Sequence, residues 1–263
     1  MINEFVLKVI LSFVIAGSWI ATATLLAERL GSKVGGLLAN LPSNILISLL
    51  FIGLTQSVSF AAEASRAAPI GMLIDSIFLF VFILALKKGL KPAVVASLAT
   101  WFGLALIAGT LQYDNMIVGI VAYALVTAFV FYILEYKMKI PAHDKSKKVY
   151  SPLQLLVRAI FAGTVVASAI IIASVGGSFW GGLFATFPAV LTSSMVILTM
   201  LQGSAFAQAT GKVMMLSSSN IAVYGIGVYL TYPTLGLMWG TLISFGAAFL
   251  WVIILSPIIQ KTT

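Results

Sequence analysis

The chain is divided into runs of about 20 apolar residues separated by short polar connectors, and this spacing restricts the fold more than any other feature. At 1.5 Å per residue, a helix of about 20 residues crosses a hydrocarbon layer about 30 Å thick. Hydrophobic residues make up 61% of the sequence and charged residues 8%, which leaves too little polar surface for a soluble domain. The sequence therefore predicts an all-α polytopic membrane protein.

Nine transmembrane spans are expected from the apolar runs, and one long polar segment, residues 135–151, is expected to be a surface loop after the fifth span. The expected spans are Phe5–Ala27, Gly35–Leu54, Ala61–Leu86, Pro92–Leu111, Met116–Leu134, Leu155–Val175, Gly181–Leu201, Ala205–Leu230 and Pro233–Leu255. The sequence has no cysteine, which excludes disulfides, thiolate metal sites and cysteine nucleophiles.

The net charge of +8 is concentrated in connectors that the nine-span count places on one side. These residues are Arg29, Lys33, Lys87, Lys88, Lys91, Lys137, Lys139, Lys145, Lys147, Lys148, Lys212 and Lys261. The other side carries little beyond Lys8 and Arg66. Because basic connectors favour the cytoplasmic side, we expect a multi-pass protein of the cell (plasma) membrane. Its C-terminus and 135–151 loop would be cytoplasmic and its N-terminus outside.

A segment near the start of the chain recurs 146 residues later. Without a gap, residues 16–61 match residues 162–207 at 16 of 46 positions. The shared residues include glycine, proline and glutamine, for example Pro42 with Pro188, and an apolar bias does not supply these residue types. The sequence therefore predicts an internal duplication.

The span count gives the relative orientation of the two copies. Residues 1–112 would form a first four-helix repeat, residues 113–152 a linker helix and cytoplasmic loop, and residues 153–263 a second four-helix repeat. One linker helix between the copies makes the second copy enter the bilayer from the opposite face. The fold expected is therefore a pair of inverted repeats.

Both copies carry the pattern Gly-Gly-x-x-Ala-x-x-Pro, whose glycines are Gly35, Gly36, Gly181 and Gly182. Proline removes an amide donor and disfavours a helical residue before it, and the glycines let backbones approach closely. Spans two and seven are therefore expected to be broken near Leu41 and Phe187, or else to begin at Pro42 and Pro188 after a re-entrant stretch. A proline kink with close glycine packing and no ligand remains the alternative.

A break of this kind exposes a helix N-terminus whose free N–H groups attract an anionic or polar ligand group. Polar residues lie beside both breaks and in a second polar stretch within the eighth span. The candidate substrate-binding residues are Asn40, Pro42, Ser43, Asn44, Pro188, Thr192, Ser193, Ser219 and Asn220.

Asp75 is an acidic residue within the third apolar span. A carboxylate at that depth is costly unless it is paired, hydrated or protonated, which suits a proton-coupling group. The corresponding position in the second copy is Ile221, so we expect one coupling site rather than two. A structural hydrogen bond from a neutral acid is the alternative role.

Three further charged residues are candidates for gates at the two mouths of a transport path. Glu63 and Arg66 are three residues apart, a spacing that allows them to pair on one helix face near the outer interface. Lys212 occupies the position that matches Arg66, near the cytoplasmic side. Interfacial pairing and snorkelling explain the same residues without any gating role.

The predicted function is an ion- or proton-coupled secondary transporter of a small solute that works by alternating access. In general plan the chain resembles the inverted-repeat secondary transporters that use discontinuous helices. The expected partners are the solute, a coupling ion (H⁺ or Na⁺) and membrane lipid. Neither an enzyme activity nor a cofactor, metal or nucleic acid is expected, and homo-oligomerisation is left open. The alternatives are a channel-type pore and a lipid-translocating or intramembrane enzyme.

Overall fold

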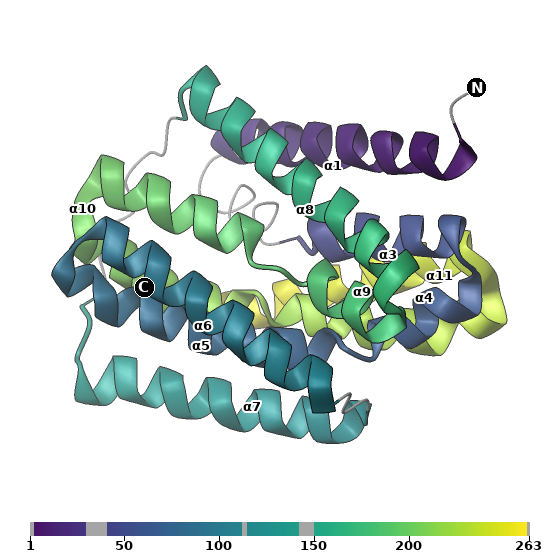
Figure 1. Ribbon diagram of the computed structural model, residues 1–263. Coiled ribbons are helices and arrows are strands. Elements are labelled where there is room, and N and C mark those ends of the chain that lie inside the picture. Colours follow the sequence, from purple (N-terminus) through teal and green to yellow (C-terminus); the bar gives the residue numbers. More distant parts are fainter. Residues whose placement is uncertain (1–2, 30–40, 112–114, 142–149, 262–263) are drawn as a thin grey trace.

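The computed structural model describes residues 3–29, 41–111, 115–141 and 150–261 (Figure 1). Within these ranges, helices are the only regular secondary structure. In chain order they are α1 (Glu4–Arg29), α3 (Ser43–Thr55), α4 (Val58–Ser65), α5 (Ala68–Ala85), η1 (Leu86–Lys88), α6 (Leu90–Leu111), α7 (Met116–Tyr132), η2 (Ile133–Lys137), α8 (Pro152–Gly176), α9 (Ser178–Ala185), α10 (Ala189–Ser217) and α11 (Ser219–Lys261).

Two of these helices double back at a glycine. Gly203 within α10 has a φ angle of 83° and Gly236 within α11 has a φ angle of 70°. Positive φ angles of this size are open to glycine and strained for other residues. Each of these elements therefore consists of two helical arms joined by a turn, and the turn of α11 lies at the right-hand end of Figure 1.

Six stretches of the described chain are long and apolar enough to cross a membrane. The last stretch, Ser178–Pro257, is 80 residues long and contains α9, α10 and most of α11. On the outer helices, large apolar side chains such as Leu106, Leu125 and Phe129 are exposed over 60% or more of their area. Extended apolar faces of this kind suit contact with lipid. The predicted all-helical architecture with long apolar helices is confirmed.

Helices α1 and α8 pack through a reciprocal pair of glycine contacts. A Cβ atom at Gly17 would lie 2.9 Å from the carbonyl oxygen of Ala159, and one at Gly163 would lie 2.6 Å from that of Phe13. Phe13 and Gly17 precede Ala159 and Gly163 by 146 residues, so each helix offers the other the same two positions. Because the later residue of one helix meets the earlier residue of the other, α1 and α8 run antiparallel (Figure 1).

The Gly-Gly pair of the second copy lies inside the short helix α9 and serves close packing. Gly181 faces the side chain of Ala173 in α8, and Gly182 faces the backbone carbonyl of Ala64 at the end of α4. The helix is interrupted only after Ala185 and resumes at Ala189. The seventh expected span is therefore two helices, with the break at residues 186–188. Gly35 and Gly36 of the first copy lie outside the described residues.

Two other expected spans are also divided between helices. The third expected span contains the end of α4 and all of α5, which are separated at Arg66 and Ala67. The eighth expected span contains the second arm of α10 and the first arm of α11, which are separated at Ser218. Pro69 in the first turn of α5 was a local signal for the first of these interruptions. No glycine or proline lies at Ser218 to indicate the second.

The glycine contact between α1 and α8 can be tested by substitution. Gly17→Ala and Gly163→Ala each place a methyl group against a backbone carbonyl that cannot rotate away, and overpacking of this kind costs about 1–3 kcal/mol. We expect both variants to lower the thermal unfolding temperature of the purified protein in detergent, by similar amounts. Gly103→Ala is the control, because nothing lies within 4 Å of its Cβ position. If that control loses as much stability as the other two, the close contact is not the cause.

Candidate functional site

The two predicted proline positions share one backbone conformation. Pro42 has φ and ψ angles of −77° and 54°, and Pro188 has angles of −75° and 49°. After each proline the next amide donates back two residues, from Ser43 to Leu41 O at 2.8 Å and from Ala189 to Phe187 O at 2.7 Å. Each proline is thus the centre of a tight inverse γ-turn. Helices α3 and α10 begin directly after these turns.

The N-termini of α3 and α10 have no side-chain cap. The first helical bonds run from Leu46 N to Pro42 O and from Thr192 N to Pro188 O, so the amides of the preceding two residues have no partner within their helix. Both helices begin near the centre of Figure 1, where α3 runs to the right and α10 to the left. The two N-terminal ends therefore face each other.

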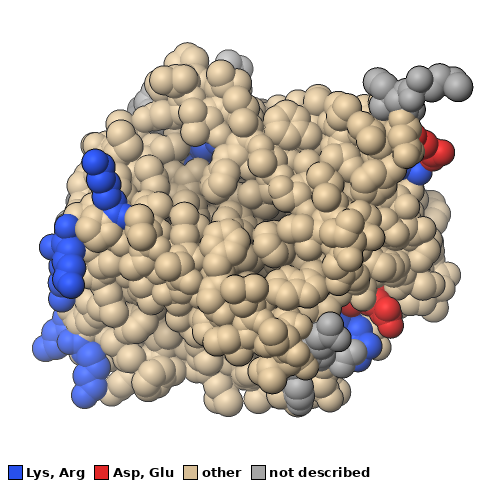
Figure 2. All heavy atoms as spheres, viewed as in Figure 1, with Lys and Arg blue, Asp and Glu red and all other residues tan. Residues whose placement is uncertain are grey.

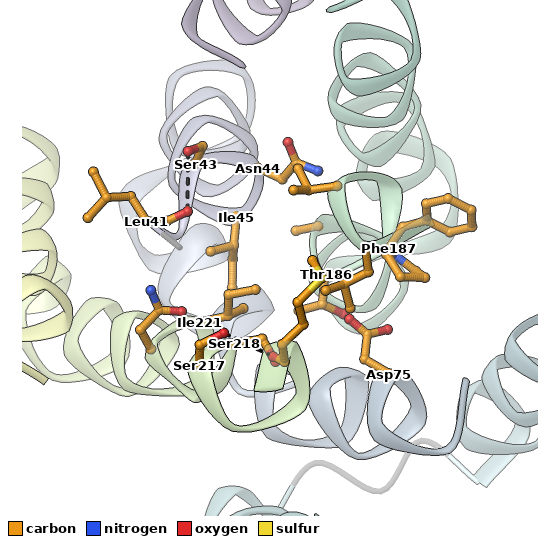
Figure 3. Close-up of a pocket in the computed structure, with 16 residues that line it drawn as sticks. Leu41, Ser43, Asn44, Ile45, Asp75, Thr186, Phe187, Ser217, Ser218 and Ile221 are labelled. Atoms are coloured by element: carbon orange, nitrogen blue, oxygen red, sulfur yellow. Dashed lines mark hydrogen bonds between the residues drawn. The ribbon is translucent and has the colours of Figure 1, made fainter. Parts of the chain in front are cut away.

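A cavity of about 50 Å³ lies where these two helix starts meet (Figure 3). It is bounded by the two proline turns, by α5 and by the junction of α10 with α11. Its lining residues are Leu41, Ser43, Asn44, Ile45, Asp75, Ala185, Thr186, Phe187, Pro188, Val190, Leu191, Met214, Ser217, Ser218, Asn220 and Ile221. A polar cavity needs roughly 10–15 Å³ to hold one water molecule, so this one has room for a very small solute.

Both copies of the sequence contribute corresponding residues to this cavity. Four pairs separated by 146 residues line it, namely Leu41 with Phe187, Asn44 with Val190, Ile45 with Leu191 and Asp75 with Ile221. A cavity lined by matched positions lies between the copies rather than inside one of them. In two of the four pairs, Asn44 with Val190 and Asp75 with Ile221, a polar residue corresponds to an apolar one, so the site is asymmetric.

Asp75 is the acid of this cavity and is 1% exposed. Its Oδ1 atom accepts a hydrogen bond of 2.9 Å from Nε1 of Trp101, whereas its buried Oδ2 atom has no hydrogen-bond partner among the described residues. Gly71, one turn earlier on the same face of α5, lies against the side chain of Thr186 at the second break. The missing side chain at Gly71 therefore lets α5 bring Asp75 to the break.

Aromatic side chains form one wall of the site. The ring of Trp101 lies 4.7 Å from that of Phe187 and 5.4 Å from that of Phe184, both with edge-to-face geometry. Phe161 of α8 packs on Phe187 with centroids 6.1 Å apart. This cluster joins the hydrogen-bond donor of Asp75 to the second helix break, and it fixes the orientation of the indole.

The remaining polar groups of the cavity come from α3 and from the junction of α10 with α11. The Oδ1 atom of Asn44 is buried without a hydrogen-bond partner in the part of the chain that the structure describes. Ser217, Ser218 and Asn220 lie opposite, around the interruption at Ser218. The hydroxyl groups of Ser217 and Ser218 donate to carbonyls of their own helix, so these residues and Asn44 Oδ1 offer acceptors, and the first-turn amides of α3 and α10 offer donors.

Of the predicted substrate-binding residues, the structure brings Ser43, Asn44, Pro188 and Asn220 to the cavity together with Asp75. Four others lie nearby but outside its lining, namely Pro42, Thr192, Ser193 and Ser219. The hydroxyl groups of Thr192 and Ser193 donate to carbonyls of their own helix, and that of Ser219 donates to Leu216 O and accepts from Trp251. Asn40 lies outside the described residues.

None of the three predicted gating residues lines the cavity. Glu63 is exposed, and the guanidinium of Arg66 lies over the ring of Tyr229 at 5.8 Å. Lys212 differs from the interfacial position expected for it, because it is 1% exposed. Its ammonium donates to Glu135 Oε2 at 2.6 Å and to a backbone carbonyl of the linker segment. The gating roles stay predictions.

Sequence reasoning did not select Trp101, Thr186 or Arg158. Trp101 contacts Asp75, and Thr186 contacts Gly71. The partners in each contact are distant in sequence, so no local pattern indicated Trp101 or Thr186. Arg158 of α8 is 7% exposed and donates to Ser194 at 2.9 Å. The sequence did contain a signal for Arg158, because it is a basic residue within an apolar span. Asp75 was selected by the same kind of signal, a charged residue within an apolar span.

In the part of the chain that the structure describes, the fold is all-helical with long apolar helices, and a partly polar cavity is lined by residues of both halves. A protein family described as "Protein of unknown function (DUF3147)" matches residues 9–113 and 155–260. The chain belongs to this family. The starts of the two matched segments, residues 9 and 155, are 146 residues apart. No curated protein and no solved structure matches the chain significantly.

The cavity can be probed with cysteines, because the natural sequence has none. We expect Asn44→Cys and Val190→Cys to react with a small water-soluble methanethiosulfonate, since both positions line the cavity. Ile52→Cys and Leu198→Cys are the matched controls, because they are 0% and 1% exposed and lie two turns further along the same helices. The control positions should react at least about tenfold more slowly. Equal protection of all four cysteines would mean that water does not reach the cavity.

Proposed function

We propose that the chain is a proton- or ion-coupled secondary transporter of a small solute, and that alternating access arises from two inverted repeats. The observation that carries this proposal is the cavity between the two halves, lined by four pairs of matched residues and by two uncapped helix starts. Transport sites of secondary transporters lie at the interface of the repeats, where helices are discontinuous.

The inverted arrangement is supported by the contact between α1 and α8. A pair of matched helices that meet through reciprocal positions and run antiparallel is related by a two-fold axis perpendicular to both. If these helices cross the bilayer, that axis lies in the membrane plane, as in inverted-repeat transporters. The family match to both halves of the chain, with the same 146-residue offset, supports the duplication itself.

The distribution of charge supports one orientation in the membrane. Figure 2 shows lysine and arginine side chains gathered at the left-hand end of the molecule, where α5 joins α6 in Figure 1. Lys87, Lys88 and Lys91 belong to this connection. Basic connectors favour the cytoplasm, so we infer that this end is cytoplasmic in the cell membrane.

Asp75 is the proposed coupling group. Its carboxyl group lies in the cavity with one oxygen fixed by Trp101 and the other available to a proton, an ion or the solute. An acid that crosses between two openings in an apolar layer must be neutralised before it moves, because the bare charge is costly there. Proton binding at Asp75 is therefore linked to the change of access.

The small size of the cavity favours a transporter over a channel. A channel needs a continuous polar path, whereas the polar lining groups of this cavity lie beside the apolar side chains of Leu41, Phe187 and Leu191. Secondary transporters hold their solute at a local site of this kind, at the interface of the repeats. Saturable flux would accompany such a site, and flux that never saturates would indicate a pore.

The coupling role predicts the behaviour of Asp75→Asn in proteoliposomes. We expect the wild type to accumulate its solute when a pH gradient is imposed, and Asp75→Asn to lose this accumulation because the amide cannot exchange a proton. The loss should be at least about tenfold in initial rate, as measured with a panel of small neutral, zwitterionic and anionic solutes.

Thr100→Ala is the control for this experiment. Thr100 lies beside Trp101 in sequence, but its hydroxyl donates only to Ala96 O within α6 and does not line the cavity. This variant should keep wild-type accumulation. Undiminished gradient-driven uptake by a folded Asp75→Asn protein would remove Asp75 from the coupling mechanism.

A further inference from the structure

Two positive helix ends and one carboxyl group converge on the cavity. The uncapped starts of α3 and α10 face each other there, and each helix start carries about half a positive elementary charge. Asp75 lines the same cavity with its Oδ2 atom buried and unpartnered among the described residues. When Asp75 is ionised, the three contributions sum to nearly zero net charge.

This charge balance discriminates among solutes. A monoanion would add to the charge of Asp75, and a simple cation would add to that of the two helix starts, so each leaves one like-charge contact in a site of low polarity. A solute that carries one charge of each sign leaves the balance unchanged. It can place each charge against its opposite.

The hydrogen-bonding groups of the cavity favour the same class of solute. The free first-turn amides at residues 44, 45, 190 and 191 can donate to a carboxylate, as helix starts do for anions. Asp75 Oδ2 and Asn44 Oδ1 can accept from an ammonium group. The cavity volume of about 50 Å³ limits the solute to a few non-hydrogen atoms.

We propose that the site takes a small zwitterion of the amino-acid type, with its ammonium on Asp75 and its carboxylate at the starts of α3 and α10. This inference rests on the proposed transport function and adds the class of solute to it. It also predicts that solute binding releases a proton, because a proton and an ammonium group compete for the same oxygen of Asp75.

The groups around Asp75 support that competition. Among the described residues, the cavity lining contains no second acid and no basic residue. Trp101 from α6 donates to the other oxygen of Asp75. Tyr123 from α7 is close enough to Asp75 for an electrostatic interaction between them. A phenol is uncharged at neutral pH. The proton that leaves Asp75 when the solute binds therefore goes to water, and the solute and proton exchange across the membrane.

The test compares three solutes of nearly equal size on the purified wild-type protein. Glycine carries both charges, acetate lacks the ammonium, and methylamine lacks the carboxylate. Equilibrium binding, measured with radiolabelled solute or by thermal shift, should favour glycine over acetate and methylamine by at least about tenfold. The affinity for glycine should rise with pH as Asp75 loses its proton. The proposal would be overturned if acetate or methylamine bound as tightly as glycine, or if glycine did not bind at all.

A variant adds an independent arm to this test. Asp75→Asn should weaken glycine binding at least about tenfold and abolish its pH dependence, whereas Thr100→Ala should keep both. Because binding is measured without a membrane, its outcome is separate from transport. Glycine binding without gradient-driven uptake in proteoliposomes would preserve the solute class and refute the transporter. Gradient-driven uptake of acetate or methylamine above that of protein-free liposomes, without glycine binding, would preserve the transporter and refute the solute class.

Discussion

An unsatisfied backbone amide inside hydrocarbon costs several kcal/mol, and this constraint organises the structure around its two proline turns. The turns at Pro42 and Pro188 leave first-turn amides without helical partners and without side-chain caps. Such amides are tolerated where protein covers them or where they line a polar cavity. Packing the two breaks against one another creates one common cavity, which needs fewer polar residues than two separate sites would.

The two halves use this arrangement differently. The first half supplies the acid of the cavity, Asp75, and the second supplies Ile221 at the matching position together with the aromatic wall around Phe187. The two halves contribute similar backbone turns but different side chains to the site. Such a site can bind a solute in one defined pose. In the proposed transport mechanism, an inverted relation between the two halves would allow two related conformations, as alternating access requires.

Local chemistry explains which features the sequence could predict. The start of α3 after Pro42 and the interruption at Pro188 were predictable because proline lacks an amide donor, and Asp75 was predictable because a charge is rare in an apolar span. Tertiary contacts explain the rest. Trp101 was not predictable because its partner is Asp75 on another helix, and Lys212 was placed at an interface because its partner, Glu135, is 77 residues away.

The polar residues beside the second break show a different limit of prediction from sequence. Thr192 and Ser193 follow Pro188 directly, yet their hydroxyl groups donate to carbonyls of α10 itself. Serine and threonine often form such local bonds within a helix, so proximity in sequence did not indicate contact with the cavity. Ser217 and Ser218 also donate to carbonyls of α10, but they line the cavity because the helix is interrupted at Ser218.

The most direct test of the central claim is the side of the membrane on which matched turns lie. Lys88 and Leu235 are exposed residues that precede the turn glycines Gly89 and Gly236 of the two halves. In intact cells, a membrane-impermeant thiol reagent should label Leu235→Cys and should label Lys88→Cys only after permeabilisation. Labelling of both cysteines from the same side would show that the halves are not inverted, and the proposed mechanism of transport would then be wrong.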